Sequence, residues 1–324
     1  MADRRATTRP HRSFFTRRTP QAAQAESRAR RAAVIVNPTK VGVDDTRTRL
    51  TIMSQRLGWG DPLILETTED DPGEGQVAEA LEAGVDLICP LGGDGTVRAV
   101  ATGLAGTSTP MGLLPGGTGN LLARNLGLPI DSVDDAFEVA CTGRNKKIDI
   151  LRITADHGAP EVGLVMAGVG FDATVMADTN ENLKGAIGWP AYIVSGMKHV
   201  IGHRFNVRIS MTGSLPRPKR VRSVIIGNCG ELQGGIPFLP DAQVDDGILD
   251  VAVLSPRTTF EWVKVIGAVL TRSTERRLER FTGAVCTIDL EEPHHFQIDG
   301  DAVGEVSHVE VEVDPASLIV RVPN

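Results

Sequence analysis

The chain has 324 residues, of which 41% are hydrophobic and 23% charged, and its net charge is −7. This length allows one large or two ordinary domains, and no apolar run approaches the roughly 20 residues that a membrane-spanning helix needs. The four cysteines lie far apart without a C-x-x-C pair, which indicates reduced thiols in a cytoplasmic protein rather than a disulfide framework.

The charge is divided unevenly along the chain. Residues 1–31 hold nine Arg against one Asp and one Glu, a net of +7, so residues 32–324 carry −14. An acidic body argues against non-specific nucleic-acid binding. Because the first segment lacks apolar periodicity, we expect residues 1–31 to form a disordered basic arm. A solvated tail, a tether to an anionic membrane surface and a transit peptide are three interpretations of this arm.

Residues 32–142 alternate between strand-like and helical segments. The runs RAAVIV, PLILETT, VDLICPL and PMGLLP are typical of strands, and helical segments lie near 44–57, 74–84 and 96–104 and from about 121. Gly84 stands where a helix cap is expected. Strands that alternate with helices predict a parallel α/β sheet.

The pattern changes beyond Gly143. A series of strand-like segments, from KKIDILRIT to LIVRVP, is joined mainly by turns, and only two helical segments, near 189–202 and 258–271, interrupt it. This pattern predicts a mostly antiparallel second domain of the β-sandwich type.

Two Gly-rich turns follow successive strands of the first domain, Gly92-Gly93-Asp94-Gly95-Thr96 and then PGGTGN at 115–120. Ligands of open α/β sheets lie at the carboxyl ends of the strands, where backbone N–H groups and a helix N-terminus bind phosphate. A carboxylate there would repel phosphate unless a divalent cation stood between them, so Asp94 indicates phosphoryl transfer. One such turn alone would indicate only a tight turn; two favour nucleotide binding.

These motifs together resemble the catalytic domain of diacylglycerol kinases, which sphingosine and ceramide kinases and soluble bacterial lipid kinases share. GGDGT by itself also fits NAD kinases and phosphofructokinases, so the combination carries the resemblance. The matching segments are VNP at 36–38, GGDGT at 92–96, PGGTGN-x-x-AR from 115, AGVGFDA at 167–173, GNCGELQGGIPFLPDAQVDDGILDV at 227–251 and IDGD at 298–301.

The resemblance implies an N-terminal Rossmann-like α/β domain, a C-terminal antiparallel β-sandwich domain and an active site in the cleft between them. It implies a nucleotide-binding domain of residues 32–142 completed by a returning strand at about 313–324, and an acceptor and catalytic domain of residues 143–312. The residues that would line ATP are Asn37, Thr67, Gly92, Gly93, Asp94, Gly95, Thr96, Gly117, Thr118 and Asn120.

It also implies catalytic and metal-binding residues. Asp94 would organise water and Mg²⁺ at the phosphates, and Asp299 and Asp301 would be the catalytic carboxylates, one of them the base for the acceptor hydroxyl. If residues 299–301 continued a strand, both side chains would point to one face. A structural Mg²⁺ would bind Asp246 with the carbonyls of Gln243 and Ile248, although residues 245–247 could equally form a plain hairpin turn.

The chain departs from the family pattern at two positions. Leu121 stands where many relatives have Asp, which removes one carboxylate from the implied network of Asp, water and Mg²⁺. Asp301 stands where many relatives have Glu, which is one methylene longer.

We therefore expect an ATP-dependent lipid kinase that phosphorylates a hydroxyl of a lipid alcohol such as diacylglycerol. An NAD kinase-like enzyme and a catalytically silent nucleotide- or lipid-binding protein are the alternatives. The enzyme would be cytoplasmic and meet its substrate at the inner face of the membrane, and a homodimer stays open. Basic residues that could face anionic headgroups, or only solvent, are Arg272, Arg276, Arg277 and Arg280.

Overall fold

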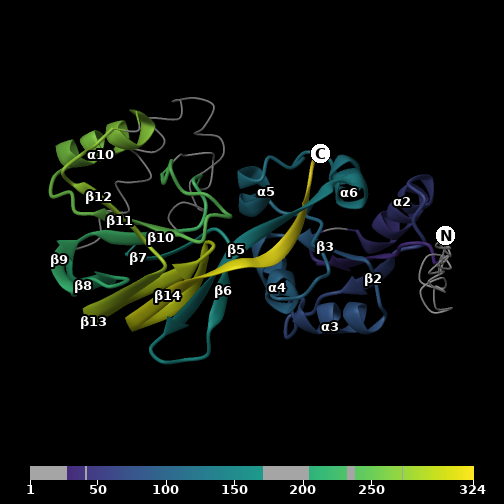
Figure 1. Ribbon diagram of the computed structural model, residues 1–324, viewed down its shortest axis with the longest axis horizontal. Helices are drawn as coiled ribbons and strands as arrows, with labels where there is room; N and C mark the ends of the chain where they lie inside the picture. Colours follow the sequence, from purple (N-terminus) through teal and green to yellow (C-terminus); the bar gives the residue numbers. More distant parts are fainter. Residues whose placement is uncertain (1–27, 41, 171–203, 232–237, 272) are drawn as a thin grey trace, which may run out of the picture.

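The computed structural model describes residues 28–40, 42–170, 204–231, 238–271 and 273–324. They form two domains that lie side by side (Figure 1). The first domain holds the strands β1 (Ala32–Val36), β2 (Leu63–Glu66), β3 (Leu87–Gly92) and β4 (Leu114–Pro115), with the helices α2 (Val43–Arg56), α3 (Glu74–Glu82), α4 (Asp94–Leu104), α5 (Leu121–Asn125) and α6 (Val133–Thr142).

The first domain is the predicted parallel α/β sheet. Its strand order is β2-β1-β3-β4, and each neighbouring pair is parallel. Every residue of β1 and β3 is buried, as expected of a parallel sheet with both faces covered. Leu50 of α2 and Phe137 of α6 pack on one face, and Val77 of α3 and Val100 of α4 pack on the other.

Local signals explain where two of these helices stop and start. Gly84 follows α3 with φ +68, in the left-handed region that glycine enters without strain. The helix α6 was not predicted, although its cap has a readable signal, because the Ser132 hydroxyl accepts a hydrogen bond from the Asp135 N–H at 3.2 Å.

The second domain is antiparallel. Its strands are β5 (Arg144–Ala155), β6 (Glu161–Gly163), β7 (Met166–Val169), β8 (Phe205–Met211), β9 (Arg217–Val221), β10 (Ser223–Gly227), β11 (Leu249–Leu254), β12 (Leu278–Gly283), β13 (Val285–Ile298) and β14 (Asp301–Val322), with the helix α10 (Thr259–Thr271). The strand order is β12-β11-β10-β7-β13-β14-β5-β6, and outside this order β8 pairs with β13 and β9 pairs with β8.

The long strand β13 makes this sheet sandwich-like. It pairs with β8 before a bulge at residues 289–294 and with β7 after it. Val207 of β8, Val224 of β10 and Val251 of β11 therefore face one core inside the second domain. The expected fold class is confirmed for both domains. The predicted helix near 189–202 lies outside the described residues.

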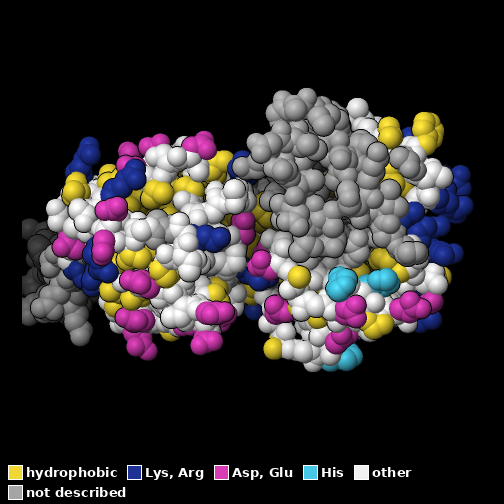
Figure 2. Space-filling view, turned by 180° about the vertical axis from the view of Figure 1, so that it is seen from behind, with side chains coloured by type: hydrophobic (Ala, Val, Ile, Leu, Met, Phe, Trp, Pro, Cys, Tyr) yellow, Lys and Arg dark blue, Asp and Glu magenta, His cyan; other side chains and the backbone are white. Residues whose placement is uncertain are grey.

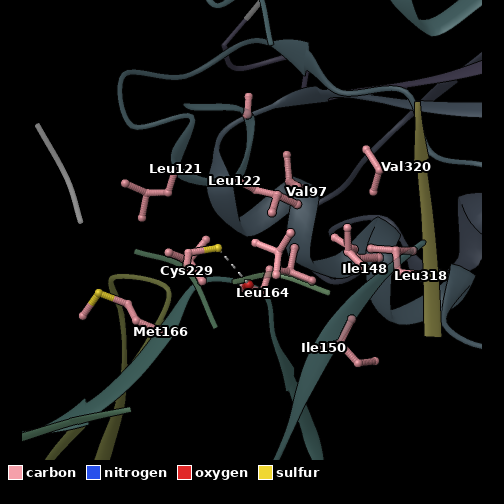
Figure 3. Close-up of a cluster of buried hydrophobic side chains, with 14 of the residues drawn as sticks. Val97, Leu121, Leu122, Ile148, Ile150, Leu164, Met166, Cys229, Leu318 and Val320 are labelled. Atoms are coloured by element: carbon pink, nitrogen blue, oxygen red, sulfur yellow. Dashed lines mark hydrogen bonds between the residues drawn. The ribbon is translucent and has the colours of Figure 1, made fainter. Parts of the chain in front are cut away.

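The two domains share one hydrophobic core. Leu121 and Leu122 of α5 and Val97 of α4 meet Ile148 and Ile150 of β5 and Leu164 between β6 and β7, together with Leu318 and Val320 from the final part of β14 (Figure 3). The final part of β14 also runs along the first domain, where the Met111 N–H donates to the Ile319 carbonyl at 2.8 Å. Burial of this shared apolar surface fixes how the domains face each other.

The described chain contacts the first domain before β1 begins. Arg28 forms an ion pair with Asp86 at 3.1 Å, and the Arg30 guanidinium lies 4.5 Å from the ring centroid of Trp59. Residues 1–27 of the expected arm lie outside the described residues. Among the helices that the structure describes, none has the length and apolar composition needed to cross a membrane.

Candidate active site

The residues expected to line the nucleotide gather at one edge of the parallel sheet. Asn37 follows β1 and Thr67 follows β2, and their backbone N–H groups donate to Leu91 O at 3.1 Å and Val36 O at 2.9 Å. Gly92 ends β3, and residues 94–96 form the first turn of α4. Thr118 and Asn120 follow β4. The carboxyl ends of the parallel strands bring these segments together.

The two Gly-rich loops lie against each other through their backbones. A Cβ atom on Gly116 would lie 2.6 Å from Gly92 N, and one on Gly117 would lie 2.8 Å from Gly93 Cα. The second loop is closed by the Asn120 side-chain amide, which donates to Gly117 O at 2.9 Å, while Asn120 itself has φ +48. Positions 116 and 117 therefore require glycine, because a Cβ atom at either one would collide with the backbone of the first loop.

Asp94 points from the first loop to the second. Its Oδ1 accepts a hydrogen bond from the Leu121 N–H at 2.8 Å, and a Cβ on Gly119 would lie 2.2 Å from its Oδ2. The Leu121 side chain is buried in the shared core. Position 121, where the family pattern implied Asp, thus contacts Asp94 through its backbone in this chain.

The turn between β13 and β14 brings the other two carboxylates to the same place. Ile298 pairs with Asp301, so Asp299 and Gly300 form a two-residue hairpin turn with φ +52 and +97, as in a type I′ turn. Because residues 299 and 300 are a turn and not a strand, the expectation that both Asp side chains point to one face is wrong.

Asp299 is enclosed by backbone donors. Its Oδ2 accepts from the Leu164 N–H at 2.9 Å, and its Oδ1 accepts from the Val165 and Met166 N–H groups at 2.8 and 3.0 Å. Burial raises the pKa of Asp299, and these three donors together with the Arg98 charge oppose that rise. The carboxylate therefore holds the segment 164–166 against the turn.

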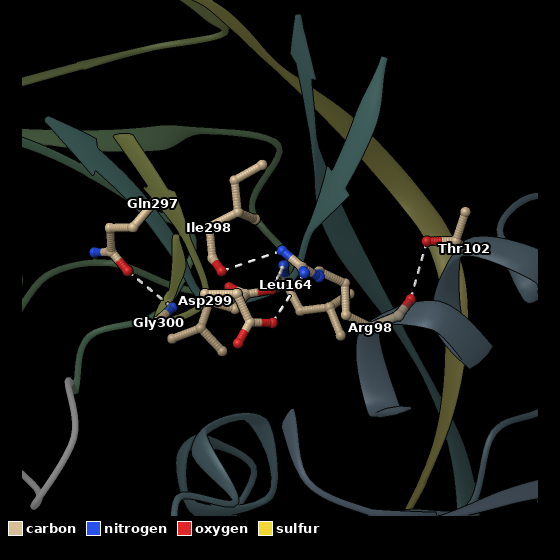
Figure 4. A network of polar contacts seen from close by, with 9 residues as sticks. Arg98, Thr102, Leu164, Gln297, Ile298, Asp299 and Gly300 are labelled. Carbon is tan, nitrogen blue, oxygen red and sulfur yellow. Dashed lines mark hydrogen bonds and ion pairs between the residues drawn. The ribbon is translucent and has the colours of Figure 1, made fainter. Parts of the chain in front are cut away.

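Asp301 is the accessible carboxylate of the pair. Its side chain is 54% exposed, and its Oδ2 accepts from Arg98 Nη2 at 2.9 Å. Arg98 projects from α4, and its Nη1 also donates to the Ile298 carbonyl at 3.1 Å (Figure 4). A Cβ on Gly95 would lie 3.3 Å from Asp301 Oδ2. The carboxylate thus lies beside the first turn of the helix that begins with Asp94.

The three carboxylates create negative charge where phosphates are expected. Burial raises the pKa of Asp94, and repulsion from Asp299 and Asp301 adds to the rise, while the N–H donors of Leu121 and Asn120 oppose it. The Arg98 guanidinium, which projects from α4, lies beside this negative charge and donates a hydrogen bond to Asp301. Oxygen ligands suit Mg²⁺, and Asp94 together with phosphate oxygens and water would supply them, because the described residues hold no group of three metal-ligating side chains.

The loop expected to hold a structural Mg²⁺ is fixed by a buried side chain. Asp149 of β5 accepts from the Gly247 and Ala316 N–H groups, both at 2.7 Å. Asp246 is exposed, and its Oδ1 accepts from the Ile248 N–H at 3.0 Å. Burial, followed by repulsion from Asp246 and Asp241, raises the pKa of Asp250 to about 6.

The fit of this loop to a metal rests on its oxygen atoms. Across the described residues no group of three metal-ligating side chains occurs, so a cation here would need the Gln243 and Ile248 carbonyls beside the Asp246 carboxylate. The mutual repulsion of Asp241, Asp246 and Asp250 favours a cation, and the assignment stays a prediction.

Sequence reasoning missed two residues that organise the site. Arg98 lies two positions after GGDGT, but its partner is 203 residues away. Asp149 occurs in an ordinary strand pattern, and only its contacts with two distant loops reveal its role.

Known proteins resemble both parts of the chain. Residues 31–153 match the model of the "Diacylglycerol kinase catalytic domain", and residues 163–322 match the "YegS C-terminal NAD kinase beta sandwich-like domain". A "Probable lipid kinase YegS-like" of Xanthomonas oryzae is 33% identical over 80% of this chain and 85% of the relative. A "Probable lipid kinase YegS" of Salmonella arizonae is 30% identical over 79% and 85%.

Solved structures agree with this grouping. A "putative diacylglycerol kinase" from Bacillus anthracis has a TM-score of 0.72 at 25% identity, over 91% of this chain and 98% of that one. An NAD kinase from Archaeoglobus fulgidus has a TM-score of 0.51 at 12% identity, over 90% and 93% of the two chains. The second likeness is one of fold alone.

Proposed function

Because the chain belongs to the family of YegS-like lipid kinases with a diacylglycerol kinase catalytic domain, we propose that it transfers the γ-phosphoryl group of ATP to a hydroxyl of a lipid alcohol such as diacylglycerol. The observation that carries the proposal is the meeting of Asp94, Asp301 and two Gly-rich loops where the domains join. NAD as the acceptor has only a distant likeness of fold in its favour.

The first domain binds the nucleotide in this proposal. Its phosphates lie at the N-terminus of α4 and against the N–H groups of the two Gly-rich loops, with Asn37, Thr67 and Thr118 around them. We assign residues 32–142 and the returning segment 313–324 to this domain. Residues 143–312 then hold the acceptor and the catalytic turn.

Asp301 is the base. It is exposed, while every oxygen of Asp299 already accepts a backbone hydrogen bond. The acceptor hydroxyl gives its proton to the Asp301 carboxylate as its oxygen bonds to the γ-phosphorus. The bond from that phosphorus to the β–γ bridging oxygen breaks in line, and ADP leaves.

Two other residues position this base. Arg98 holds the Asp301 carboxylate and the Ile298 carbonyl on one guanidinium, which fixes the distance between α4 and the catalytic turn. Asp299 fixes the turn from its other side. Asp94 and the phosphates would hold Mg²⁺, which neutralises charge on the phosphoryl group when bound.

The test is an acceptor screen with the purified chain, ATP and Mg²⁺. Diacylglycerol, a sphingoid base and NAD are offered separately, and each phosphorylated product is identified by mass spectrometry. We expect a phosphorylated lipid alcohol from the wild type and none from Asp301→Asn. Phosphorylated NAD with no lipid product would replace the proposed acceptor class, and bound ATP without any product would indicate a binding protein.

A lipid acceptor implies work at a membrane. We propose a cytoplasmic enzyme that contacts the inner face of the membrane peripherally, where anionic lipids attract basic side chains.

A further inference from the structure

The strands β9 and β12 and the helix α10 lie at one end of the second domain (Figure 1). Figure 2, seen from behind, shows dark blue Lys and Arg side chains along this edge. From residue 204 to residue 222 the chain carries six Lys or Arg residues and no Asp or Glu. In a chain with a net charge of −7 this segment stands out, so the charge is strongly polarised along the molecule.

Five arginines form the centre of this basic end. Arg204 donates to the Arg220 carbonyl, Arg222 Nε donates to the Pro256 carbonyl at 2.7 Å, and Arg257 follows Pro256. Glu261 links Arg257 to Arg277, since it accepts from the Arg257 N–H and lies 3.0 Å from Arg277 Nη2. We call Arg204, Arg220, Arg222, Arg257 and Arg277 the arginine cluster.

The arginine cluster keeps an excess of positive charge. Burial lowers the pKa of Arg204, and repulsion from the other four arginines lowers it further. Within the described part of the chain, Glu261 is the carboxylate that pairs with the cluster. One carboxylate against the guanidinium groups of Arg204, Arg220, Arg257 and Arg277 leaves an excess of positive charge that an anionic partner can neutralise.

Apolar side chains are exposed directly beside the cluster. Phe260 and Val263 of α10 are 68% and 49% exposed, and Lys264 Nζ lies 4.9 Å from the Phe260 ring centroid. Residues at positions i, i+3 and i+4 share one helix face. The opposite face, with Trp262, Val265 and Val269, is buried in the shared core. The outer face of α10 is thus apolar and cationic at once.

We propose that the arginine cluster, together with Phe260, Val263 and Lys264, docks this enzyme on an anionic lipid bilayer. The inference rests on the proposed function, because a lipid acceptor must be reached at a membrane. Guanidinium groups match anionic headgroups, and an exposed Phe and Val match the boundary of the acyl chains. A nucleic acid or an acidic protein would use the charges but would leave the two apolar side chains without a role.

The test measures vesicle binding by the full chain without ATP and without acceptor, so that catalysis plays no part. Vesicles of phosphatidylcholine with and without phosphatidylglycerol are sedimented with the protein. One variant is Arg220→Gln with Arg257→Gln, because the contacts given above for these two residues use backbone atoms that Gln retains. The other variant is Phe260→Ser.

The matched controls lie on α2 in the first domain. Arg47→Gln with Arg56→Gln removes the same charge from exposed positions, and Ile52→Ser removes a side chain that is 54% exposed. We expect the controls to bind anionic vesicles like the wild type. Removing two arginines of the cluster should weaken binding about thirty-fold at low salt, roughly five-fold for each, and less at high salt. Phe260→Ser should weaken it about ten-fold.

Several outcomes would overturn the docking surface. One is equal binding by the cluster variant and its control, and another is no preference of the wild type for anionic vesicles. A third is loss of heparin binding as large as the loss of vesicle binding, with no effect of Phe260→Ser, which would indicate a general polyanion site.

Turnover of detergent-dispersed acceptor separates this inference from the proposed function. Both variants should phosphorylate such an acceptor like the wild type, since docking is then not needed; a parallel loss of turnover would overturn the proposal by placing these residues in the catalytic machinery. If the wild type phosphorylates no lipid alcohol while vesicle binding follows the expected pattern, the docking surface stands and the proposed acceptor fails.

Discussion

At the scale of single residues, Asp94 is the side chain whose charge can be removed with little change of shape. In Asp94→Asn, the side-chain oxygen can still accept from the Leu121 N–H. We expect turnover to fall by at least about two orders of magnitude, the scale of losing one electrostatic contact to the transition state, with the thermal unfolding midpoint unchanged. Turnover within a few-fold of the wild type would mean that this carboxylate does not face the phosphates.

Asp299 and Asp301 should be separable by stability. Asn at 299 would turn an amide NH₂ toward backbone N–H donors, so Asp299→Asn should lower the free energy of unfolding by about 1–3 kcal/mol as well as abolish transfer. Asp301→Asn should abolish transfer at nearly wild-type stability, because that side chain is 54% exposed. Both should still bind ATP. Urea unfolding, calorimetry with ATP and product formation are measured together.

The opposite result is informative. Equal destabilisation by the two substitutions would mean that Asp301 is also a structural carboxylate, and normal turnover in both would place the base elsewhere. Asp301→Glu is the conservative control and should retain activity, because it keeps a carboxylate on a side chain that is 54% exposed.

Which parts of this site can be predicted from sequence depends on how local their cause is. The Gly-rich turn and Asp94 are readable because strand, turn and helix are consecutive in the chain. The geometry of Asp299 and Asp301 could not be predicted from the sequence pattern. Positive φ values make residues 299 and 300 a turn, and the alternation of side chains along a strand does not hold in a turn. Arg98 could not be assigned, because nothing in a sequence ties it to a residue 203 positions later.

At the scale of elements, the packing of the two loops makes different predictions for two glycines. Gly116→Ala places a Cβ 2.6 Å from Gly92 N, against backbone that cannot move alone. It should therefore lower the unfolding midpoint and ATP affinity together. Gly93→Ala meets nothing within 4 Å, so it should keep the midpoint and lose ATP affinity if the new methyl group lies in the proposed phosphate site.

These two variants are compared by thermal unfolding and by ATP titration. Gly267→Ala on α10, where a Cβ also meets nothing within 4 Å, is the control for adding a methyl group. Unchanged ATP affinity in Gly93→Ala would move the phosphates away from the first loop.

A second element-level prediction concerns the carboxylate that joins three segments. Asp149 is only 1% exposed and connects β5 to the loop at residues 244–248 and to the bulge in β14. Asp149→Asn should lower the free energy of unfolding by about 1–3 kcal/mol, since one buried N–H loses its acceptor. Chemical denaturation measures this. The exposed Asp241→Asn is the control, and equal stability of both variants would contradict the assignment.

The elements themselves were more predictable than their partners. The parallel sheet follows from apolar runs alternating with helical segments, because strands buried on both faces need continuous apolar sequence. The crossing of β14 into the first domain follows from no local pattern; its residues 317–322 read like any strand, and the family resemblance alone pointed to a return. The crossing is explained by the backbone N–H and carbonyl groups of Met111, which would lack hydrogen-bond partners without β14.

At the scale of the whole molecule, the shared core makes the two domains one unit for unfolding. Ile148, Ile150 and Leu164 of the second domain are buried in one cluster with side chains of α4 and α5, so neither domain has a complete apolar surface of its own. We expect a single cooperative transition in calorimetry, with equal calorimetric and van't Hoff enthalpies. Two resolved transitions would show that each domain is stable alone.

The path of β14 also has a consequence for synthesis on the ribosome. The strand starts at Asp301, the proposed catalytic base, and ends where the Arg321 N–H donates to the Met111 carbonyl at 2.8 Å. The parallel sheet is therefore translated first but lacks one edge partner until residues 317–322 emerge, which reverses the usual order in which an N-terminal domain folds first. A nascent chain stalled before residue 313 should be protease-sensitive throughout and should bind no ATP, so the proposed nucleotide site would become functional only after the proposed catalytic carboxylate has been made.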